Sequence, residues 1–126
     1  YLAQQGMAER CRTEAGSFFE TIPGGADAYF MKHILHDWDD EDCLRILSNC
    51  RAAMTDQAKL LVCEKVVPAG NGPSVAKTID LVMLVLTDGG RERTAEEFRG
   101  LFARASLRLA RVVSTRVDNS ILEVTR

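Results

Sequence analysis

The stretch KHILHDWDDEDCLRIL, Lys32–Leu47, decides the fold, because it predicts the point where a buried strand gives way to a helix. Residues 26–35 are largely apolar and follow a Pro-Gly-Gly sequence, which is typical of a strand buried on both faces. Residues 39–54 predict a helix, since apolar side chains recur on one face at Cys43, Leu47, Cys50 and Met54. The acidic residues Asp39, Asp40 and Glu41 fall in its first turn, where the helix dipole favours negative charge.

The remainder of the chain continues the alternation of strands and helices. Thr94 and Glu97 have the spacing of a capping box, which predicts the start of a further helix. The expected elements are, in order, a weak helix at 2–10, a strand at 26–35, a helix at 39–54, a strand at 59–67, helices at 77–86 and 95–105, and strands at 107–115 and 120–125. This order predicts an α/β fold, an open parallel sheet that ends in an antiparallel hairpin.

Composition and charge argue against two kinds of partner. The 126 residues carry 16 basic and 18 acidic side chains, a formal charge of −2 that favours neither nucleic acid nor a membrane surface. The longest apolar run, Leu81–Leu86, is far too short to cross a bilayer. The four cysteines form no CxxC pair, so we expect reduced, mostly buried thiols in a cytoplasmic protein, with a zinc site only a minor alternative.

Three places are candidates for a ligand site, because open α/β sheets bind ligands at the carboxyl ends of their strands. These places are residues 36–38, 64–68 and 88–94. His36 is a candidate general base, since an imidazole with a pKa near ~6.5 accepts a proton at cellular pH. Glu64 and Glu92 lie at matching positions, where a carboxylate would fix the tautomer of the imidazole. In the alternative interpretation His36 only ends a strand, Glu64 is a surface charge and Glu92 pairs with a neighbouring arginine.

The other polar residues near His36 have two interpretations each. His33 lies within the predicted strand and His36 beyond it, so we expect no metal site. Lys32 either reaches an anion or extends to solvent. Trp38 either stacks on an aromatic ligand or anchors the following helix in the core. The G-x-G sequence at 70–72 lacks the third glycine of a dinucleotide fingerprint, so a nucleotide site has no support.

Four blocks carry a resemblance to a known family. They are GSFFETIPGGADAYFMKHILHDWDDEDCLRILSNCRAAM (16–54), KLLVCEKVVP (59–68), KTIDLVMLVLTDGGRERTAEEF (77–98), and SLRLARVVST with SILEV (106–115 and 120–124). Together they resemble the plant-type, small-molecule O-methyltransferases that use S-adenosylmethionine, and their bacterial relatives acting on polyketides and carotenoids. The KHILHDWDD and GGRERT segments are highly specific in this order and spacing. The resemblance implies the C-terminal portion of a class I, Rossmann-like methyltransferase fold.

The resemblance also implies roles for individual residues. The family's catalytic base falls on His36, and its two supporting acidic residues fall on Glu64 and Glu92. By this resemblance His36 deprotonates a substrate hydroxyl, and the oxyanion attacks the sulfonium methyl group in line. The positions that match cofactor contacts are Ser17, Phe18, Lys32 and Trp38. The positions that match the substrate pocket are Asp80, Met83 and Thr87.

The chain departs from the family pattern in two ways. Ser17 stands where the family usually has an aspartate near the adenine amine, so a shorter and neutral side chain takes that place. The family's glycine-rich cofactor loop and its N-terminal dimerisation helices would lie upstream of Tyr1. We therefore expect residues 1–126 to be the C-terminal part of a catalytic domain that is inactive alone and whose parent is a homodimer. We also expect a bare edge strand, at 26–35 or near Arg12, that promotes self-association.

Two other functions fit the same residues. Some bacterial relatives keep the cofactor and carry out hydroxylation or decarboxylation. The observation that discriminates this function is whether His36→Ala abolishes methyl transfer in the intact parent. A non-catalytic interaction module would use the open edge of the sheet instead.

Overall fold

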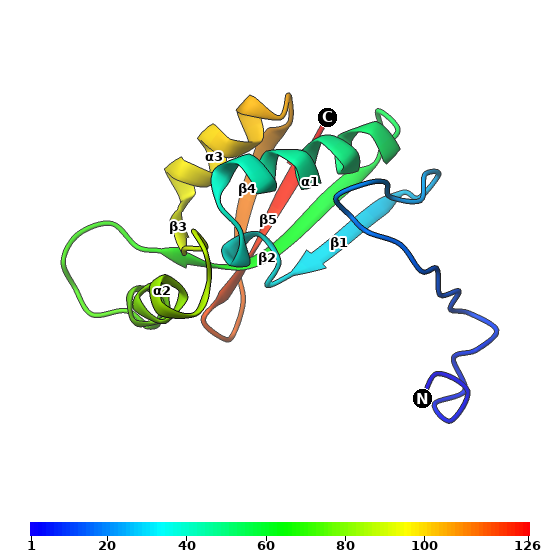
Figure 1. Cartoon of the computed structure of the whole chain (residues 1–126), viewed down its shortest axis with the longest axis horizontal. Coiled ribbons are helices and arrows are strands. Elements are labelled where there is room, and N and C mark those ends of the chain that lie inside the picture. The colour runs from blue at the N-terminus through cyan, green and yellow to red at the C-terminus, as the bar shows by residue number, and fades with distance from the viewer.

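The computed structural model describes residues 1–126, and its strands and helices alternate as in an α/β protein (Figure 1). The elements are β1 (Ala28–Lys32), the 3-10 helix η1 (Leu35–Asp37), α1 (Asp40–Ala53), β2 (Lys59–Val67), α2 (Val75–Leu86), β3 (Arg93–Thr94), α3 (Ala95–Arg104), β4 (Arg108–Ser114) and β5 (Asn119–Thr125). None of the helices is long and apolar enough to cross a membrane.

The sheet is mixed, with the strand order β1-β2-β5-β4 and the short β3 paired to β2. β1 and β3 run parallel to β2, whereas β5 runs antiparallel to both β2 and β4. The predicted α/β fold, with parallel strands first and an antiparallel hairpin at the end, is therefore confirmed. Because β5 lies between β2 and β4, the last strand of the chain is in the centre of the sheet.

The core lies between the sheet and two helices, α1 and α3, which run side by side over one face of it (Figure 1). The predicted apolar stripe of α1 is buried in full, as the residue exposures of Cys43, Leu47, Cys50 and Met54 show. α3 contributes Phe98 and Phe102, whose rings stack 5.9 Å apart. The sheet contributes buried residues of its two central strands: Leu60, Val62, Leu122 and Val124.

Side-chain caps fix where both of these helices begin. Asp39 accepts a hydrogen bond from the backbone N–H of Asp42 at 2.9 Å, so it caps α1. At α3 the predicted capping box is present, with the N–H of Glu97 donating to Thr94 and the N–H of Thr94 donating to Glu97. Since Thr94 also belongs to β3, this cap holds the preceding residues of the chain against the end of β2.

Two predicted elements differ from the structure. The strand predicted at 26–35 is only five residues long, and it lies at the sheet edge with Phe30 62% exposed rather than buried on both faces. It ends early because His33 adopts a positive φ of 52°, which turns the chain out of the extended conformation. The helix predicted at 2–10 is wrong, because this segment forms only turns and extends away from the body (Figure 1). Gly6 takes a φ of 65° there, and a short helix without tertiary contacts is marginal in water.

Leu122 tests the central position of β5. Its side chain is fully buried against the helices, so Leu122→Ala should lower the free energy of unfolding by about 2–5 kcal/mol in urea titrations. Val113→Ala in the neighbouring strand is the control, since Val113 is 38% exposed and should cost much less. Equal losses for the two variants would contradict this arrangement of the core.

Candidate active site

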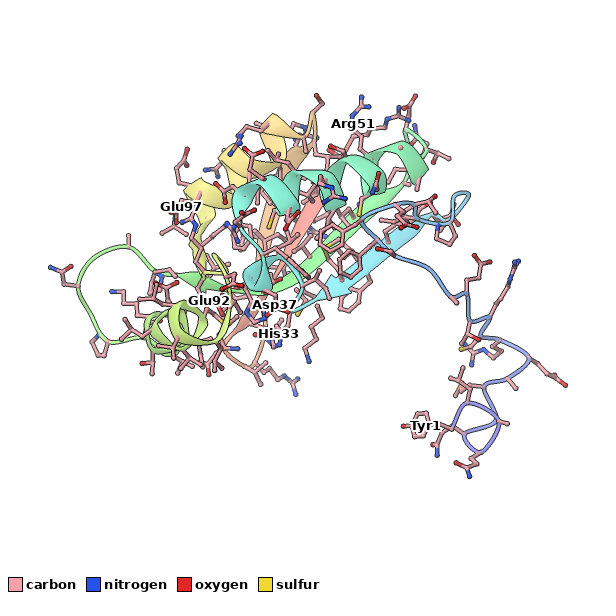
Figure 2. All side chains as sticks on the ribbon, in the orientation of Figure 1. Tyr1, His33, Asp37, Arg51, Glu92 and Glu97 are labelled. Carbon is pink, nitrogen blue, oxygen red and sulfur yellow. The ribbon has the colours of Figure 1, made fainter.

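The candidate site forms where β1 ends and the chain turns through η1 into α1. His36 lies in the middle of η1, with Leu35 buried beneath it. Figure 2 shows that the labelled side chains His33, Asp37 and Glu92 meet near this turn, Glu92 coming from the segment between α2 and α3. The fold therefore brings polar side chains together near the carboxyl ends of β1 and β2, as predicted.

Glu92 binds the imidazole of His36 directly. Nδ1 of His36 lies 3.0 Å from Oε1 of Glu92, whose side chain is fully buried. Because a carboxylate only accepts hydrogen bonds, this contact assigns the proton of neutral His36 to Nδ1 and leaves the lone pair on Nε2. Oδ1 of Asp37 lies 3.4 Å from that Nε2, and the ring of His33 lies 5.2 Å from the ring of His36.

Glu64 acts on the backbone of the turn. Its Oε1 accepts hydrogen bonds from the N–H groups of Ile34 at 3.0 Å and Leu35 at 2.9 Å, and its side chain is fully buried. It makes no hydrogen bond to the imidazole, although ligand atoms of Glu64, Glu92 and His36 all lie within 4.8 Å of one another. Both predicted carboxylates are thus near His36. Glu92 binds its imidazole ring, and Glu64 binds the backbone just before it.

These contacts shift two pKa values in the same direction. The hydrogen bond to Glu92 raises the pKa of His36 above its usual 6.5, against the opposing effect of burial, and the charges of Glu64 and Asp37 add to the rise. Burial raises the pKa of Glu64 above its usual range, opposed by the charge of His36 and by the two backbone hydrogen bonds. The site therefore stabilises an imidazolium once His36 has taken up a proton.

Two buried oxygens of the site have no hydrogen-bond partner, Oε2 of Glu64 and Oε2 of Glu92. Orphaned buried acceptors are uncommon, and here they add negative charge around a single imidazole. Two unpartnered carboxylate oxygens suit a cationic group nearby. His36, Glu64 and Glu92 are also the residues that could hold a metal ion, but Nδ1 of His36 and Oε1 of Glu64 are already engaged in hydrogen bonds. That the site works without a metal remains our prediction.

The residues predicted to contact a cofactor lie at the β1 edge. Phe18 and Lys32 line the same open cavity of about 360 Å³, whose other lining residues are all hydrophobic. Trp38 is half-buried and packs edge-on against Phe19, with ring centroids 4.7 Å apart, and against Phe18 at 6.3 Å. It is therefore in contact with the core, as one of its two interpretations predicts. Ser17 accepts a hydrogen bond from the N–H of Phe19 at 3.3 Å and does not line this cavity.

The residues predicted to contact a substrate lie on α2 and its end. Asp80 accepts a hydrogen bond from the N–H of Glu92 at 2.8 Å, so it holds the carboxylate that orients His36. Asp80 and Glu92 line a second cavity of about 350 Å³. Met83 is buried, and Thr87 donates a hydrogen bond to its carbonyl oxygen at 2.9 Å; neither lines that cavity. Contact of these three residues with a substrate remains a prediction.

Three residues of the site were not predicted from the sequence. Arg93 is fully buried and binds Asp40, for which the sequence indicates only a place in the first turn of the helix. Gly90 allows a close approach, because a Cβ atom there would lie 2.5 Å from the carbonyl oxygen of His36 and 2.8 Å from the carbonyl carbon of Asp37. The paired glycines of the GGRERT segment were a signal for Gly90, whereas nothing in the local pattern indicates a buried arginine.

Comparison with known proteins identifies the family of the chain. Residues 1–108 match the O-methyltransferase domain family. The phenazine O-methyltransferase PhzM of Lysobacter antibioticus is 47% identical over 97% of this chain, which spans 36% of that protein. The crystal structure of LaPhzM superposes with a TM-score of 0.93 at 46% identity, covering 98% of this chain and 37% of the other. NcsB1 of neocarzinostatin biosynthesis, solved with S-adenosylmethionine and 2-hydroxy-5-methyl naphthoic acid, gives 0.87 at 35% identity, covering 98% and 36%.

The fold is that of the C-terminal portion of a class I methyltransferase domain, as in the solved structures that this chain resembles. The chain belongs to the O-methyltransferase domain family. It spans about a third of the length of the curated relatives that it matches.

The pKa of His36 can be measured in this chain, because it has only two histidines and hence two imidazole signals in an NMR titration. Glu92→Gln removes the carboxylate that raises this pKa, so His36 should titrate closer to ~6.5. Glu96→Gln is the control, since Glu96 is exposed and should leave the titration unchanged. An unchanged His36 titration in Glu92→Gln would show that the hydrogen bond does not form.

The raised pKa of His36 also predicts how stability depends on pH. The contact between His36 and Glu92 stabilises the fold fully below the unfolded pKa of ~6.5, and this contribution is lost as the pH rises through the folded pKa.

Proposed function

We propose that a protein containing this chain transfers a methyl group from S-adenosylmethionine to a hydroxyl group of an aromatic or polyketide-like small molecule, with His36 as general base. The observation that carries the proposal is the 3.0 Å contact between Nδ1 of His36 and buried Glu92, which leaves the lone pair on Nε2 to accept a proton beside Oδ1 of Asp37 at 3.4 Å. A phenol with a pKa near ~10 is a weak nucleophile until it loses its proton, so such a base is what the reaction needs.

In the proposed mechanism each residue of the site has one task. Nε2 of His36 takes the proton of the acceptor hydroxyl as the oxygen attacks. Glu92 keeps the proton of the neutral ring on Nδ1 and stabilises the imidazolium that forms, while Asp80 holds the backbone of Glu92. Glu64 fixes the turn and adds a negative charge close to the imidazolium. S-adenosylmethionine, when bound, supplies the electrophilic methyl group on a sulfonium.

The residues present fit such a cofactor. The sulfonium is a cation, and the two orphaned carboxylate oxygens of Glu64 and Glu92 favour positive charge in this part of the protein. We assign Phe18 and Lys32, which share a cavity, to the side that would hold the rest of the cofactor, with Trp38 behind Phe18 and Ser17 beside it. Asp80, Met83 and Thr87 are assigned to the acceptor side.

The relatives support the acceptor class. The names of two of them refer to phenazine and to the 6-O position in mitomycin biosynthesis, and NcsB1 was solved with a hydroxynaphthoic acid. These are aromatic or quinone-like ring systems from secondary metabolism. We further propose that the parent protein is a homodimer and that residues 1–126 alone associate through the open edge at β1, where Phe30 is exposed.

Replacement of the base tests the proposal. In an active protein that contains this chain, His36→Ala should lower kcat for methyl transfer by about 10²–10⁴-fold, because general-base catalysis contributes that much. Radiolabelled methyl incorporation measures the rate, and Glu96→Gln on the surface of α3 is the control. Unchanged methyl transfer in His36→Ala would exclude the proposed role of His36 as general base.

Cofactor binding by residues 1–126 alone is a separate test. The chain spans 36% of its relative PhzM, and the cavity beside Phe18 and Lys32 is open, so we expect no tight binding of S-adenosylmethionine. Isothermal titration calorimetry should give no saturable signal at micromolar concentrations. Micromolar affinity for the isolated chain would contradict the expectation that half of the cofactor site lies elsewhere.

A further inference from the structure

The guanidinium of Arg93 is fully buried beside the turn that carries His36. Its Nη1 donates to the carbonyl oxygen of Leu35 at 2.9 Å, and its Nη2 donates to the carbonyl oxygen of Trp38 at 3.1 Å. Nη2 and Nε also donate to Oδ1 of Asp40, at 2.7 and 3.2 Å, and Nη1 lies 3.3 Å from the carbonyl oxygen of Arg91. All three nitrogens of the side chain are therefore engaged.

These contacts hold the backbone on both sides of His36. Leu35 directly precedes His36 and Trp38 follows it by two residues, so one planar group holds the carbonyls at both ends of the turn. The thiol of Cys43 lies 3.2 and 3.6 Å from the same two carbonyl oxygens and can donate its single hydrogen to either. Arg93 and Cys43 thus bind the carbonyl groups of the turn, whereas Glu64 binds its N–H groups.

The position of Arg93 in the chain links it to the ring as well as to the turn. Arg93 directly follows Glu92, and it lies in β3, where it pairs with Val66 of β2. The adjacent residues Glu92 and Arg93 therefore place a carboxylate at the imidazole of His36 and a guanidinium at the backbone of the turn that carries His36. A shift of this segment or of η1 would change the 3.0 Å contact between Glu92 and His36.

We propose that Arg93 is a positioning residue for His36, acting through the carbonyl groups of Leu35 and Trp38. The proposal rests on the proposed function of His36 and deepens it. A guanidinium suits this task because its rigid fork of donors reaches two carbonyls and a carboxylate at once, which an ammonium on a flexible chain does not. Asp40 supplies the counter-charge that a buried cation requires.

The titration of His36 reports on this positioning. The charged groups that face the imidazole are Glu92 before β3, Glu64 on β2 and Asp37 in η1, and the neighbouring titratable ring is His33. Of these, Glu92 has the largest effect on His36 through its hydrogen bond. If the turn loosens, this bond weakens and His36 titrates at lower pH, whereas a loss of overall stability alone leaves the titration of the folded molecules unchanged.

The test uses two variants of the 126-residue chain that conserve its net charge. Arg93→Lys keeps the positive charge but loses the fork of donors. Arg93→Met combined with Asp40→Leu removes the ion pair as a whole, and replacing a buried pair by apolar residues often leaves stability unchanged or improved. The control is Arg104→Met, because Arg104 is exposed and lies 3.4 Å from Oδ2 of the same Asp40 without touching the turn.

Circular dichroism first establishes that each variant is folded, and NMR then follows the two imidazole signals with pH. We expect a lower His36 pKa in either Arg93 variant that folds, with His36 titrating as in the wild type in Arg104→Met. In an active protein containing the chain, Arg93→Lys should lower kcat by about 10²-fold with unchanged KM values, as a small misplacement of a catalytic group does.

Two outcomes would overturn the proposal. One is a folded Arg93 variant in which His36 titrates as in the wild type. The other is failure of both Arg93 variants to fold, which would make the residue a structural one. The NMR result does not depend on methyl transfer. A shifted His36 pKa in the Arg93 variants of this chain, together with no methyl transfer by the longer parent protein, would reject the proposed function and leave the positioning role standing.

Discussion

The turn that follows β1 is held by two buried charges of opposite sign, and the site depends on this. Turns normally lie at the surface, because buried backbone groups need hydrogen-bond partners. Here Glu64 accepts from two N–H groups of the turn, and Arg93 donates to two of its carbonyls. A non-regular segment can therefore lie partly inside the protein, with His36 fixed between a strand and a helix.

This arrangement separates the tasks of the charged residues around His36. Glu64 and Arg93 act on the main chain, while Glu92 alone makes a hydrogen bond to the ring. Asp80 and Gly90 in turn fix the segment that carries Glu92, one by accepting its N–H and the other by leaving room for the carbonyl of His36. These parts come from β2, β3, α2 and the loop between α2 and β3, so the geometry of the site depends on how these elements pack together.

Much of the fold follows from local patterns in the sequence. The stripe of α1, the run of β2 and the capping box of α3 each need only a few neighbouring residues, and these elements were predicted closely. The failures are of two kinds. At residues 2–10 the weak helical pattern has no tertiary contact to support it. After Lys32 the apolar pattern continues, but His33 turns the chain with a positive φ that hydrophobicity does not report.

The site shows the same division. His36, Glu64 and Glu92 were candidates because they lie near ends of strands and loops that meet in a parallel sheet, and the family resemblance gave them their roles. The burial of Arg93 could not be predicted, since it depends on the pairing of β3 with β2 and on Asp40 of α1, which lies opposite Arg93 and 53 positions away in the chain. The place of β5 between β2 and β4 is likewise a long-range feature that a short turn between two strands does not specify.

The most direct test of His36 as general base compares acceptors whose hydroxyl groups differ in pKa. In an active protein containing this chain, the ratio of kcat in the wild type to kcat in His36→Ala would be measured for a series of substituted phenolic acceptors. The account predicts a large ratio for weakly acidic hydroxyls, falling toward one as the acceptor pKa drops below the assay pH and the phenol ionises without help. A ratio that stays the same across the series would contradict the assignment of His36 as the proton acceptor.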